Sequence, residues 1–224
     1  MEREQEITAI PIHETFRVAA LLAVVGGFLD AYTYILRGGV FANAQTGNML
    51  LLGVSLSEGN FHLVVRYLFP VLAFAIGIAL ADVVRMKGII RLHWRQISVL
   101  FEALILATVS LMPHSMNLLA NSLTSLACGI QVESFRKIHG NGIATTMCIG
   151  NLRSATQNLC SYFYTKEKGH LEKGLLYYGI IFCFVIGAVI GNAFIKIFHE
   201  KAILCCSVMM FLAFILMFID RERG

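Results

Sequence analysis

The sequence predicts an all-α integral membrane protein built from two internal repeats, which we expect to be inverted relative to each other. The first observation is the composition: 57% of the 224 residues are hydrophobic and 14% are charged, whereas soluble domains carry about 25% charged residues. The second is the gathering of that charge into short segments between long uncharged windows. The third is a polar, glycine-rich stretch at 38–53, GGVFANAQTGNMLLLG, which recurs in looser form at 139–158.

The two copies of this stretch indicate an internal duplication. One gapless offset of 103 positions aligns a TGN or IGN turn, a glycine and a carboxylate, and such an alignment is typical of a repeat. The pairs that share this offset are Asn48 with Asn151, Gly47 with Gly150, Gly26 with Gly129, and Asp30 with Glu133. We therefore place repeat 1 at 16–113 and repeat 2 at 114–224, within a single membrane domain preceded by a charged N-terminal cytoplasmic tail at 1–15.

Each repeat is expected to hold three transmembrane helices and one broken or re-entrant helix of the TGN type. Apolar windows long enough to cross a bilayer core of about 30 Å define the helices. In repeat 1 they lie at 16–36, 63–84 and 97–112, and the TGN segment has an apolar part of only eight residues at 49–56. In repeat 2 they lie at 118–135, 175–198 and 202–219, and FAIGIALAD in repeat 1 aligns with FVIGAVIGN in repeat 2 at an offset of 110.

Whether the TGN segments cross the bilayer decides the symmetry. If each dips in and returns, a repeat crosses three times and the repeats are inverted; if each crosses, the repeats are parallel. The re-entrant topology places 14 Lys and Arg residues inside and 4 outside, with both termini cytoplasmic, whereas the crossing topology places 9 inside and 8 outside, with Arg153 at membrane depth. Because cytoplasmic loops are enriched in basic residues, we favour six crossings plus two re-entrant segments.

The two polar loops are the candidate functional region. Loops at membrane depth must be buried in protein or line a wet cavity, and Thr46 and Asn48 could each cap the helix that begins at the first turn. Two inward-pointing helix N-termini would then face each other near the midplane, where secondary transporters bind substrate. The alternative is that the turns are tight structural corners that hold helices together.

Acids inside the apolar windows carry the second functional signal. A carboxylate near the centre of a membrane helix costs roughly 2.5–3.5 kcal/mol, so its presence needs a reason. Asp30 and Glu133 fit a coupling-ion or proton site, or else bind a loop N–H or reach the interface. Glu102 fits a buried hydrogen bond to another helix as well as a role in transport. Arg153 could coordinate an anion if its helix faces the cavity.

The predicted substrate or ion path collects these polar residues from both repeats. It consists of Asp30, Asn43, Gln45, Thr46, Gly47, Asn48, Gln131, Glu133, Thr145, Thr146, Gly150, Asn151 and Arg153. The six cysteines lie within or beside apolar segments without metal-binding spacing, so we interpret them as small buried hydrophobic residues. No catalytic, phosphate-binding or dinucleotide motif is present. We therefore expect no enzyme activity, no cofactor and no metal.

The chain resembles the YoaK family, bacterial membrane proteins with a domain of unknown function. The resemblance rests on Gly-Phe-Leu-Asp-Ala-Tyr at 27–32, Phe-Ala-Asn-x-x-Thr-Gly-Asn at 41–48, and Thr-Thr-x-x-x-Gly-Asn-Leu at 145–152. The second turn has Ile149 where the family pattern leads us to expect threonine. Membership implies a bacterial inner-membrane location and supplies no substrate.

Two functions are open at this point. The first is a small-solute or ion transporter or channel with a midplane site formed by the two TGN-type helices. The alternative is a non-transporting membrane protein that acts as an assembly or interaction partner. The expected partners are the lipid bilayer, an unidentified small solute or ion and, as an open option, further copies of the chain. Nucleic acid is not expected, since the net charge of +4 reflects loop charges that set membrane orientation.

Overall fold

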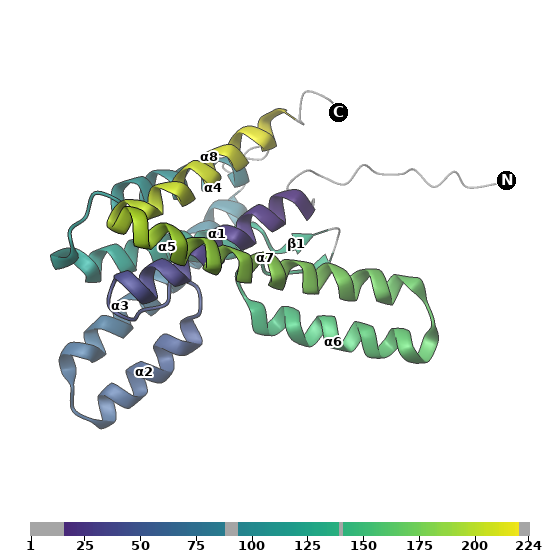
Figure 1. The fold of residues 1–224 in the computed structure, drawn as a ribbon, viewed down its shortest axis with the longest axis horizontal. Coiled ribbons are helices and arrows are strands. Elements are labelled where there is room, and N and C mark those ends of the chain that lie inside the picture. Colours follow the sequence, from purple (N-terminus) through teal and green to yellow (C-terminus); the bar gives the residue numbers. More distant parts are fainter. Residues whose placement is uncertain (1–15, 88–93, 139–140, 220–224) are drawn as a thin grey trace.

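The computed structural model describes residues 16–87, 94–138 and 141–219, and within these ranges the chain is mainly helical (Figure 1). The helices are α1 (Phe16–Leu36), α2 (Gln45–Ser57), α3 (Phe61–Lys87), α4 (Trp94–Val109), α5 (Asn117–Ser134), α6 (Cys148–Thr165), α7 (Lys168–Phe198) and α8 (Ile203–Ile219). Short 3-10 turns, η2 (His114–Met116) and η3 (His199–Ala202), precede α5 and α8. Strands β1 (Lys137–Ile138) and β2 (Asn141–Gly142) pair antiparallel after α5. The tail expected at 1–15 lies outside the described residues.

Three stretches of the described chain are long and apolar enough to cross a membrane, namely Phe16–Leu36, Phe61–Lys87 and Lys168–Met217. The first has the bounds that hydropathy predicts. The third contains both α7 and α8, which are separated at His199, where φ is +49°. Because left-handed backbone ends a helix, α7 and α8 are two helices. At 1.5 Å per residue, α4 and α8 each extend about 25 Å, slightly less than the core thickness.

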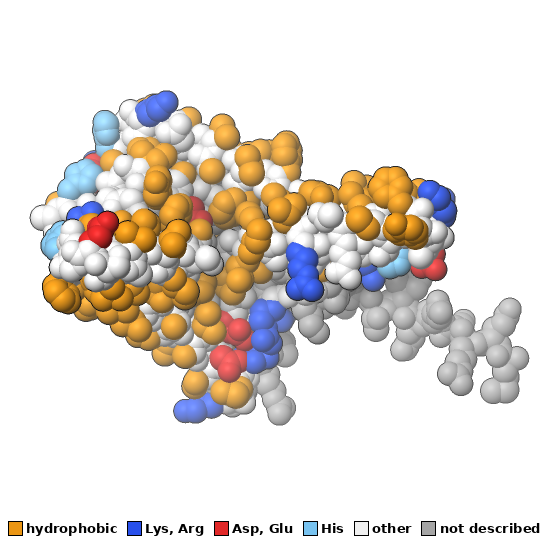
Figure 2. Space-filling view, turned by 90° about the horizontal axis from the view of Figure 1, so that it is seen from below, with side chains coloured by type: hydrophobic (Ala, Val, Ile, Leu, Met, Phe, Trp, Pro, Cys, Tyr) orange, Lys and Arg blue, Asp and Glu red, His pale blue; other side chains and the backbone are white. Residues whose placement is uncertain are grey.

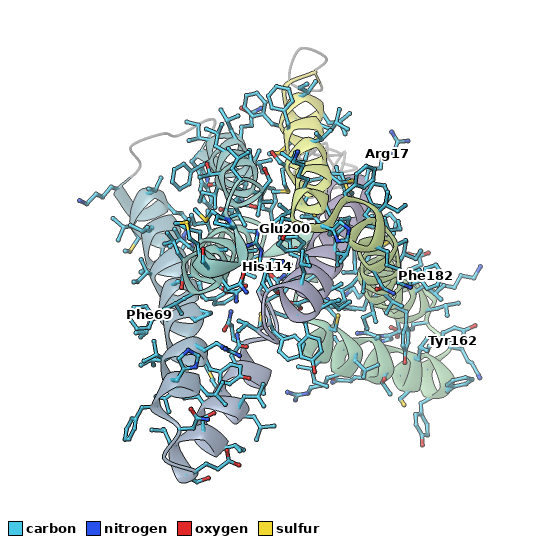
Figure 3. The ribbon with its side chains drawn as sticks, turned by 60° about the vertical axis from the view of Figure 1, so that its left-hand side comes forward. Arg17, Phe69, His114, Tyr162, Phe182 and Glu200 are labelled. Atoms are coloured by element: carbon cyan, nitrogen blue, oxygen red, sulfur yellow. The ribbon has the colours of Figure 1, made fainter. Side chains whose placement is uncertain are left out.

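The outer surface of the bundle is apolar. Large hydrophobic side chains lie exposed along α3 and α7, including Phe69, Ile76, Phe182 and Val189, and Figure 3 shows Phe69 and Phe182 pointing away from the molecule. Figure 2 shows hydrophobic side chains spread over one face, with charged side chains gathered in small clusters. A surface of this kind is stable against lipid and would aggregate in water.

The interior is organised by two close helix pairs, α1 with α7 and α3 with α5, and by α4 packed against α8. Helices α1 and α7 run parallel, since Gly187 lies against Val24 and Gly191 lies against Phe28. A Cβ on Gly27 would overlap the carbonyl oxygen of Phe184. Only glycine permits this approach, in which the two backbones touch.

The α3–α5 pair repeats the same contact. A Cβ on Gly129 would overlap the carbonyl oxygen of Phe74, and a Cβ on Gly77 would overlap that of Leu126. By its backbone contact Gly129 corresponds to Gly27, whereas the sequence offset of 103 pairs Gly129 with Gly26. Helix pairs α2–α3 and α6–α7 extend from this centre in different directions (Figure 1).

Candidate functional site

The first polar loop folds back along α1. Gly38 and Gly39 have φ values of +90° and +75°, which turn the chain after α1 ends at Leu36. The loop then returns until Asn43 Nδ2 donates a hydrogen bond to the carbonyl oxygen of Gly26 at 3.1 Å. Gly26 lies ten residues before the end of α1, a distance of about 15 Å along the helix. Helix α2 therefore begins beside the middle of α1.

Asp30 holds this loop in place. Its side chain is 7% exposed, and Oδ1 accepts hydrogen bonds from the backbone N–H groups of Asn43 at 2.7 Å and Ala44 at 3.5 Å. A carboxylate next to the N-terminus of α2 is also favoured by the helix dipole. Asp30 thus binds loop N–H groups, as the structural interpretation of this acid expects, and it also faces the cavity described below.

Asn48 and Asn151 each close their loop over seven residues. Asn48 Nδ2 donates to the carbonyl oxygen of Phe41 at 2.7 Å, and its Oδ1 accepts from the Phe41 N–H at 3.0 Å. Asn151 Nδ2 donates to the carbonyl oxygen of Ala144 at 2.6 Å. The two loops therefore share one closing contact at equivalent positions.

The prediction that Thr46 and Asn48 cap α2 is wrong. The helix begins at Gln45, with Ala44 as the N-cap residue and no capping bond from a side chain. Thr46 and Asn48 lie inside the first turn. Asn48 instead satisfies the backbone of the incoming loop, because its amide can donate to and accept from Phe41 at the same time.

Two buried glutamines connect the loops to the neighbouring helices. Gln45 Nε2 donates to the carbonyl oxygen of Ala42 at 2.8 Å and to Ser125 Oγ of α5 at 3.3 Å. Gln131 Nε2 donates to Thr145 Oγ1 and to the carbonyl oxygen of Leu22 of α1, each at 3.3 Å. Each loop is therefore linked through a glutamine to α5, and Gln131 extends the connection to α1.

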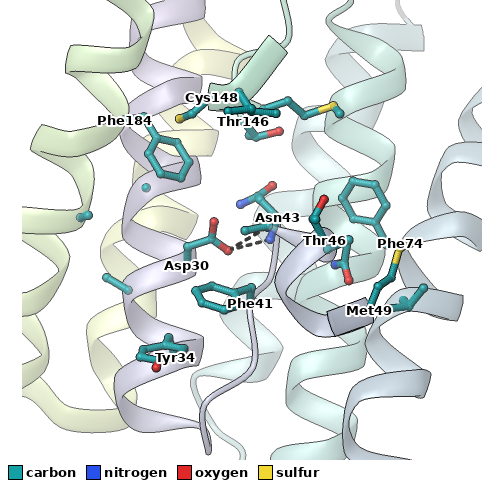
Figure 4. Close-up of a pocket in the computed structure, with 18 of the residues that line it drawn as sticks. Asp30, Tyr34, Phe41, Asn43, Thr46, Met49, Phe74, Thr146, Cys148 and Phe184 are labelled. Carbon is teal, nitrogen blue, oxygen red and sulfur yellow. Dashed lines mark hydrogen bonds between the residues drawn. The ribbon is translucent and has the colours of Figure 1, made fainter. Parts of the chain in front are cut away.

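Both loop–helix junctions line one cavity of about 840 Å³, which we call the central cavity (Figure 4). This volume lies within the range of small-molecule sites. The polar lining includes Asp30, Asn43, Gln45, Thr46 and Thr146, and the apolar lining includes Phe41, Val71, Phe74, Ile78, Phe184 and Ala188. Thr146 Oγ1 is buried and makes no hydrogen bond within the described residues.

Much of this lining consists of positions related by the two sequence offsets. The offset of 103 relates Asn43 to Thr146, Ala44 to Met147, Gln45 to Cys148 and Thr46 to Ile149, and the offset of 110 relates Phe74 to Phe184 and Ile78 to Ala188. Asp30 breaks the pattern, because its sequence counterpart Glu133 is not part of the lining. Among the described residues that line the central cavity, Asp30 is thus the one carboxylate.

Five of the thirteen predicted path residues line the central cavity, namely Asp30, Asn43, Gln45, Thr46 and Thr146. Asn48, Gln131, Thr145 and Asn151 are buried behind it and support the loops. Gly47 lies under the ring of Phe41, whereas Gly150 has open space beside its Cα. Asp30 belongs to α1 and Gln131 to α5, and the other positions belong to the two polar loops and the first turns of α2 and α6.

Glu133 and Arg153 lie elsewhere. Glu133, near the end of α5, lies 3.3 Å from Arg136 and 3.5 Å from Arg85. Arg153 is exposed on α6. The sequence pairing of Asp30 with Glu133 therefore does not translate into two acids in one site.

The aromatic lining was not among the predicted site residues. Phe74 and Phe184 open the FAIG and FVIG segments whose alignment defines the second offset, so a signal for them was present. Tyr34 stacks on Phe41 with ring centroids 4.7 Å apart. Glu102 is 1% exposed and its Oε1 makes no hydrogen bond within the described residues. No group of three or more His, Cys, Asp or Glu in the described chain could hold a metal ion.

Comparison with known proteins agrees with this architecture of apolar helices. A family model described as "Protein of unknown function (DUF1275)" matches residues 18–216. The UPF0700 transmembrane protein YoaK of Bacillus subtilis (strain 168) is 25% identical over 179 residues, which cover 76% of this chain and 80% of that protein. No solved structure matches the chain.

Proposed function

Because the chain belongs to the DUF1275 family, whose description assigns no activity, we propose from its geometry that it is a small-solute transporter or channel of the bacterial inner membrane. The observation that carries this proposal is the central cavity, in which two broken-helix junctions and the buried carboxylate of Asp30 meet. Secondary transporters place substrate at such junctions, where unwound backbone offers hydrogen bonds at membrane depth. The proposal assigns the chain no catalysis.

The chemistry of the lining indicates the kind of solute. A dehydrated metal ion prefers several oxygen ligands, and the central cavity instead has aromatic and aliphatic walls with a few polar groups at the loops. Such walls suit a small amphipathic organic molecule. Asp30 is a hydrogen-bond acceptor, so we assign the polar end of the solute a donor such as an amine.

We further propose that the repeats are inverted and that α2 and α6 are re-entrant. The first loop reaches Gly26 in the middle of α1. Arg66, in the second turn of α3, contacts the carbonyl oxygen of Gly38 at the end of α1 at 3.5 Å. Helix α2 thus runs from the middle of α1 back to the side of the membrane where α1 ends. The excess of basic residues on one side supports six crossings with both termini in the cytoplasm.

Uptake into proteoliposomes tests transport. The purified protein would be reconstituted and supplied with a panel of small amines, neutral amphipathic solutes and monovalent cations. Replacing Asp30 by Asn keeps the size and removes the charge, and we expect uptake of the transported amine to fall by about tenfold or more. The matched control is Asp82→Asn, the same change at a half-buried acid that contacts Arg85 outside the central cavity. Absence of uptake for every probe, or equal uptake by both variants, contradicts the proposal.

A structural role is the second candidate, and the bonds from Asp30 to the Asn43 and Ala44 N–H groups favour it. In that case the chain is an assembly or interaction partner of other membrane proteins. Asp30→Asn would then lower the thermal stability in detergent without changing any flux. Measuring melting temperature and uptake on the same preparation separates the two functions.

A further inference from the structure

A second cavity lies where the ends of three helices meet. It has a volume of about 290 Å³ and lies between the end of α1, the first turns of α3, and the start of α5 with its preceding turn η2. Its lining includes Arg37, His62, Arg66, His114, Asn117 and Asn121, and no described carboxylate is part of it. We call it the basic pocket. It has no lining residue in common with the central cavity.

Arg37 brings a buried positive charge to this pocket. Its side chain is 1% exposed, and its guanidinium donates to Tyr32 Oη at 2.7 and 3.0 Å and to the carbonyl oxygen of Val109 at 3.2 Å. It also donates to Asn117 Oδ1 at 3.2 Å and to the carbonyl oxygen of Pro113 at 3.3 Å. These acceptors are all neutral, so the hydrogen bonds are satisfied, while no carboxylate of the described residues forms an ion pair with the guanidinium and Glu200 interacts with it at longer range. A buried charge without a counter-charge in contact is costly.

Arg66 and His62 supply hydrogen-bond donors that make few contacts with the described part of the protein. They are four residues apart on α3 and so lie on the same face of the helix. Within the described residues, the contact of Arg66 is the long hydrogen bond to the carbonyl oxygen of Gly38. Arg66 is half-buried and His62 is exposed, so both are reachable from outside.

Glu200 interacts electrostatically with Arg37 and is also paired with a histidine. Glu200 Oε1 lies 2.6 Å from Nε2 of His114, and these two side chains lie next to each other in Figure 3. The two arginines therefore exceed the one carboxylate even when both histidines are neutral. Asn117 and Leu118 of the lining begin α5, and the N-terminus of a helix adds positive potential.

We propose that the basic pocket binds an oxyanion of the phosphate class. A guanidinium matches two phosphate oxygens at once, and an anion would offset the positive charge that remains when Glu200 is counted against the two arginines. The pocket lies at helix ends, so the phosphate could belong to a lipid headgroup or be free in solution. Arg66 and His62 contact the anion, and Arg37 acts through its charge because its N–H groups are in use.

The test uses the full chain purified in detergent. Inorganic phosphate would be titrated against an equal ionic strength of chloride, and in a separate arm short-chain phosphatidylglycerol would be titrated against a short-chain lipid without phosphate. Thermal unfolding and titration calorimetry report binding. Arg66→Gln removes the accessible donor and should weaken binding by about tenfold or more, whereas Arg153→Gln, at an exposed arginine on α6, should leave it unchanged. Arg66 is chosen because a variant at the buried Arg37 could fail to fold.

The two arms identify the source of the phosphate. Binding in the phosphate arm assigns a free anion, and binding in the lipid arm alone assigns a headgroup. The proposal is overturned if neither arm stabilises the wild-type protein more than its control does. It is equally overturned if Arg66→Gln binds phosphate and lipid as tightly as the wild type.

Discussion

At the scale of single residues, the loops are held by buried amide and carboxylate side chains that bind backbone groups. In hydrocarbon an unpaired N–H or C=O costs several kcal/mol, so an irregular loop needs such partners. Asn48 satisfies both polar groups of Phe41, and Asp30 satisfies the N–H of Asn43. The polarity of these residues is therefore required by the fold whether or not a solute passes.

Asn48→Ala should destabilise the protein. The change removes two hydrogen bonds to the backbone of Phe41 and leaves both backbone groups without these partners, which costs about 2 kcal/mol. The measurement is the melting temperature in detergent. Asn60→Ala is the control, because Asn60 makes one exposed 3.3 Å bond to the N–H of Leu63. Equal melting temperatures for the two variants would contradict the assignment.

The sequence pattern predicted which residues line the central cavity better than it predicted the partners that these residues bind. Asp30 and Asn43 could be selected because polar residues in an apolar window need partners. Which partner each one finds depends on how the loop returns along α1, and no local spacing encodes that return. Glu133 shows the limit: it matches Asp30 in sequence, yet it lies near Arg85 of another helix. The prediction that Asn48 caps α2 was wrong for the same reason: Asn48 binds Phe41, which comes within reach only because the loop returns along α1.

At the scale of elements, two glycine crossings set how closely the helices approach. Without a hydrophobic force between helices in lipid, small residues and backbone contact drive association. Gly187 and Gly27 allow α1 to touch α7, and Gly77 and Gly129 do the same for α3 and α5. These contacts place Phe184 and Phe74 on the central cavity. The crossing geometry therefore shapes the candidate site.

Gly187→Val should separate α1 from α7. Its Cβ would overlap the backbone of Val24, which cannot move aside as a flexible side chain could, so we expect a loss of about 2 kcal/mol or more in stability. Thermal unfolding in detergent measures it. Gly53→Ala in α2 is the control, because nothing lies within 4 Å of the added Cβ, and it should leave stability unchanged or slightly raised. A Gly187→Val protein as stable as the control would contradict the crossing.

The helices themselves could be predicted closely. Hydropathy alone located α1 at its observed bounds and α3, α4, α5 and α8 to within a few residues, because the bilayer imposes a fixed length on apolar segments. Helix α7 begins seven residues before the predicted span. Its first two turns are polar and pair with α6, through contacts such as His170 with Asn158. Hydropathy contains no signal for this extension.

At the scale of the whole molecule, the proposed topology places 85–95 and 166–173 on the same side of the membrane. The argument joins two observations: the first loop returns to the middle of α1 before α2 begins, and the basic residues divide 14 to 4 in this topology. If α2 and α6 crossed instead, these two segments would lie on opposite sides. The relative side of Met86 and Lys166 therefore distinguishes the proposed re-entrant topology from the crossing topology.

Cysteine labelling from each side of the membrane measures this. On a cysteine-free background, single cysteines at Met86 and Lys166, both exposed, should react with a membrane-impermeant maleimide only when the cytoplasmic side is accessible. Cysteines at Asn60 and Ser115, also exposed, should react only from the opposite side and serve as the matched controls. If Met86 and Lys166 label from opposite compartments, α2 and α6 cross the bilayer, and their N-termini then cannot both open at mid-depth onto the central cavity.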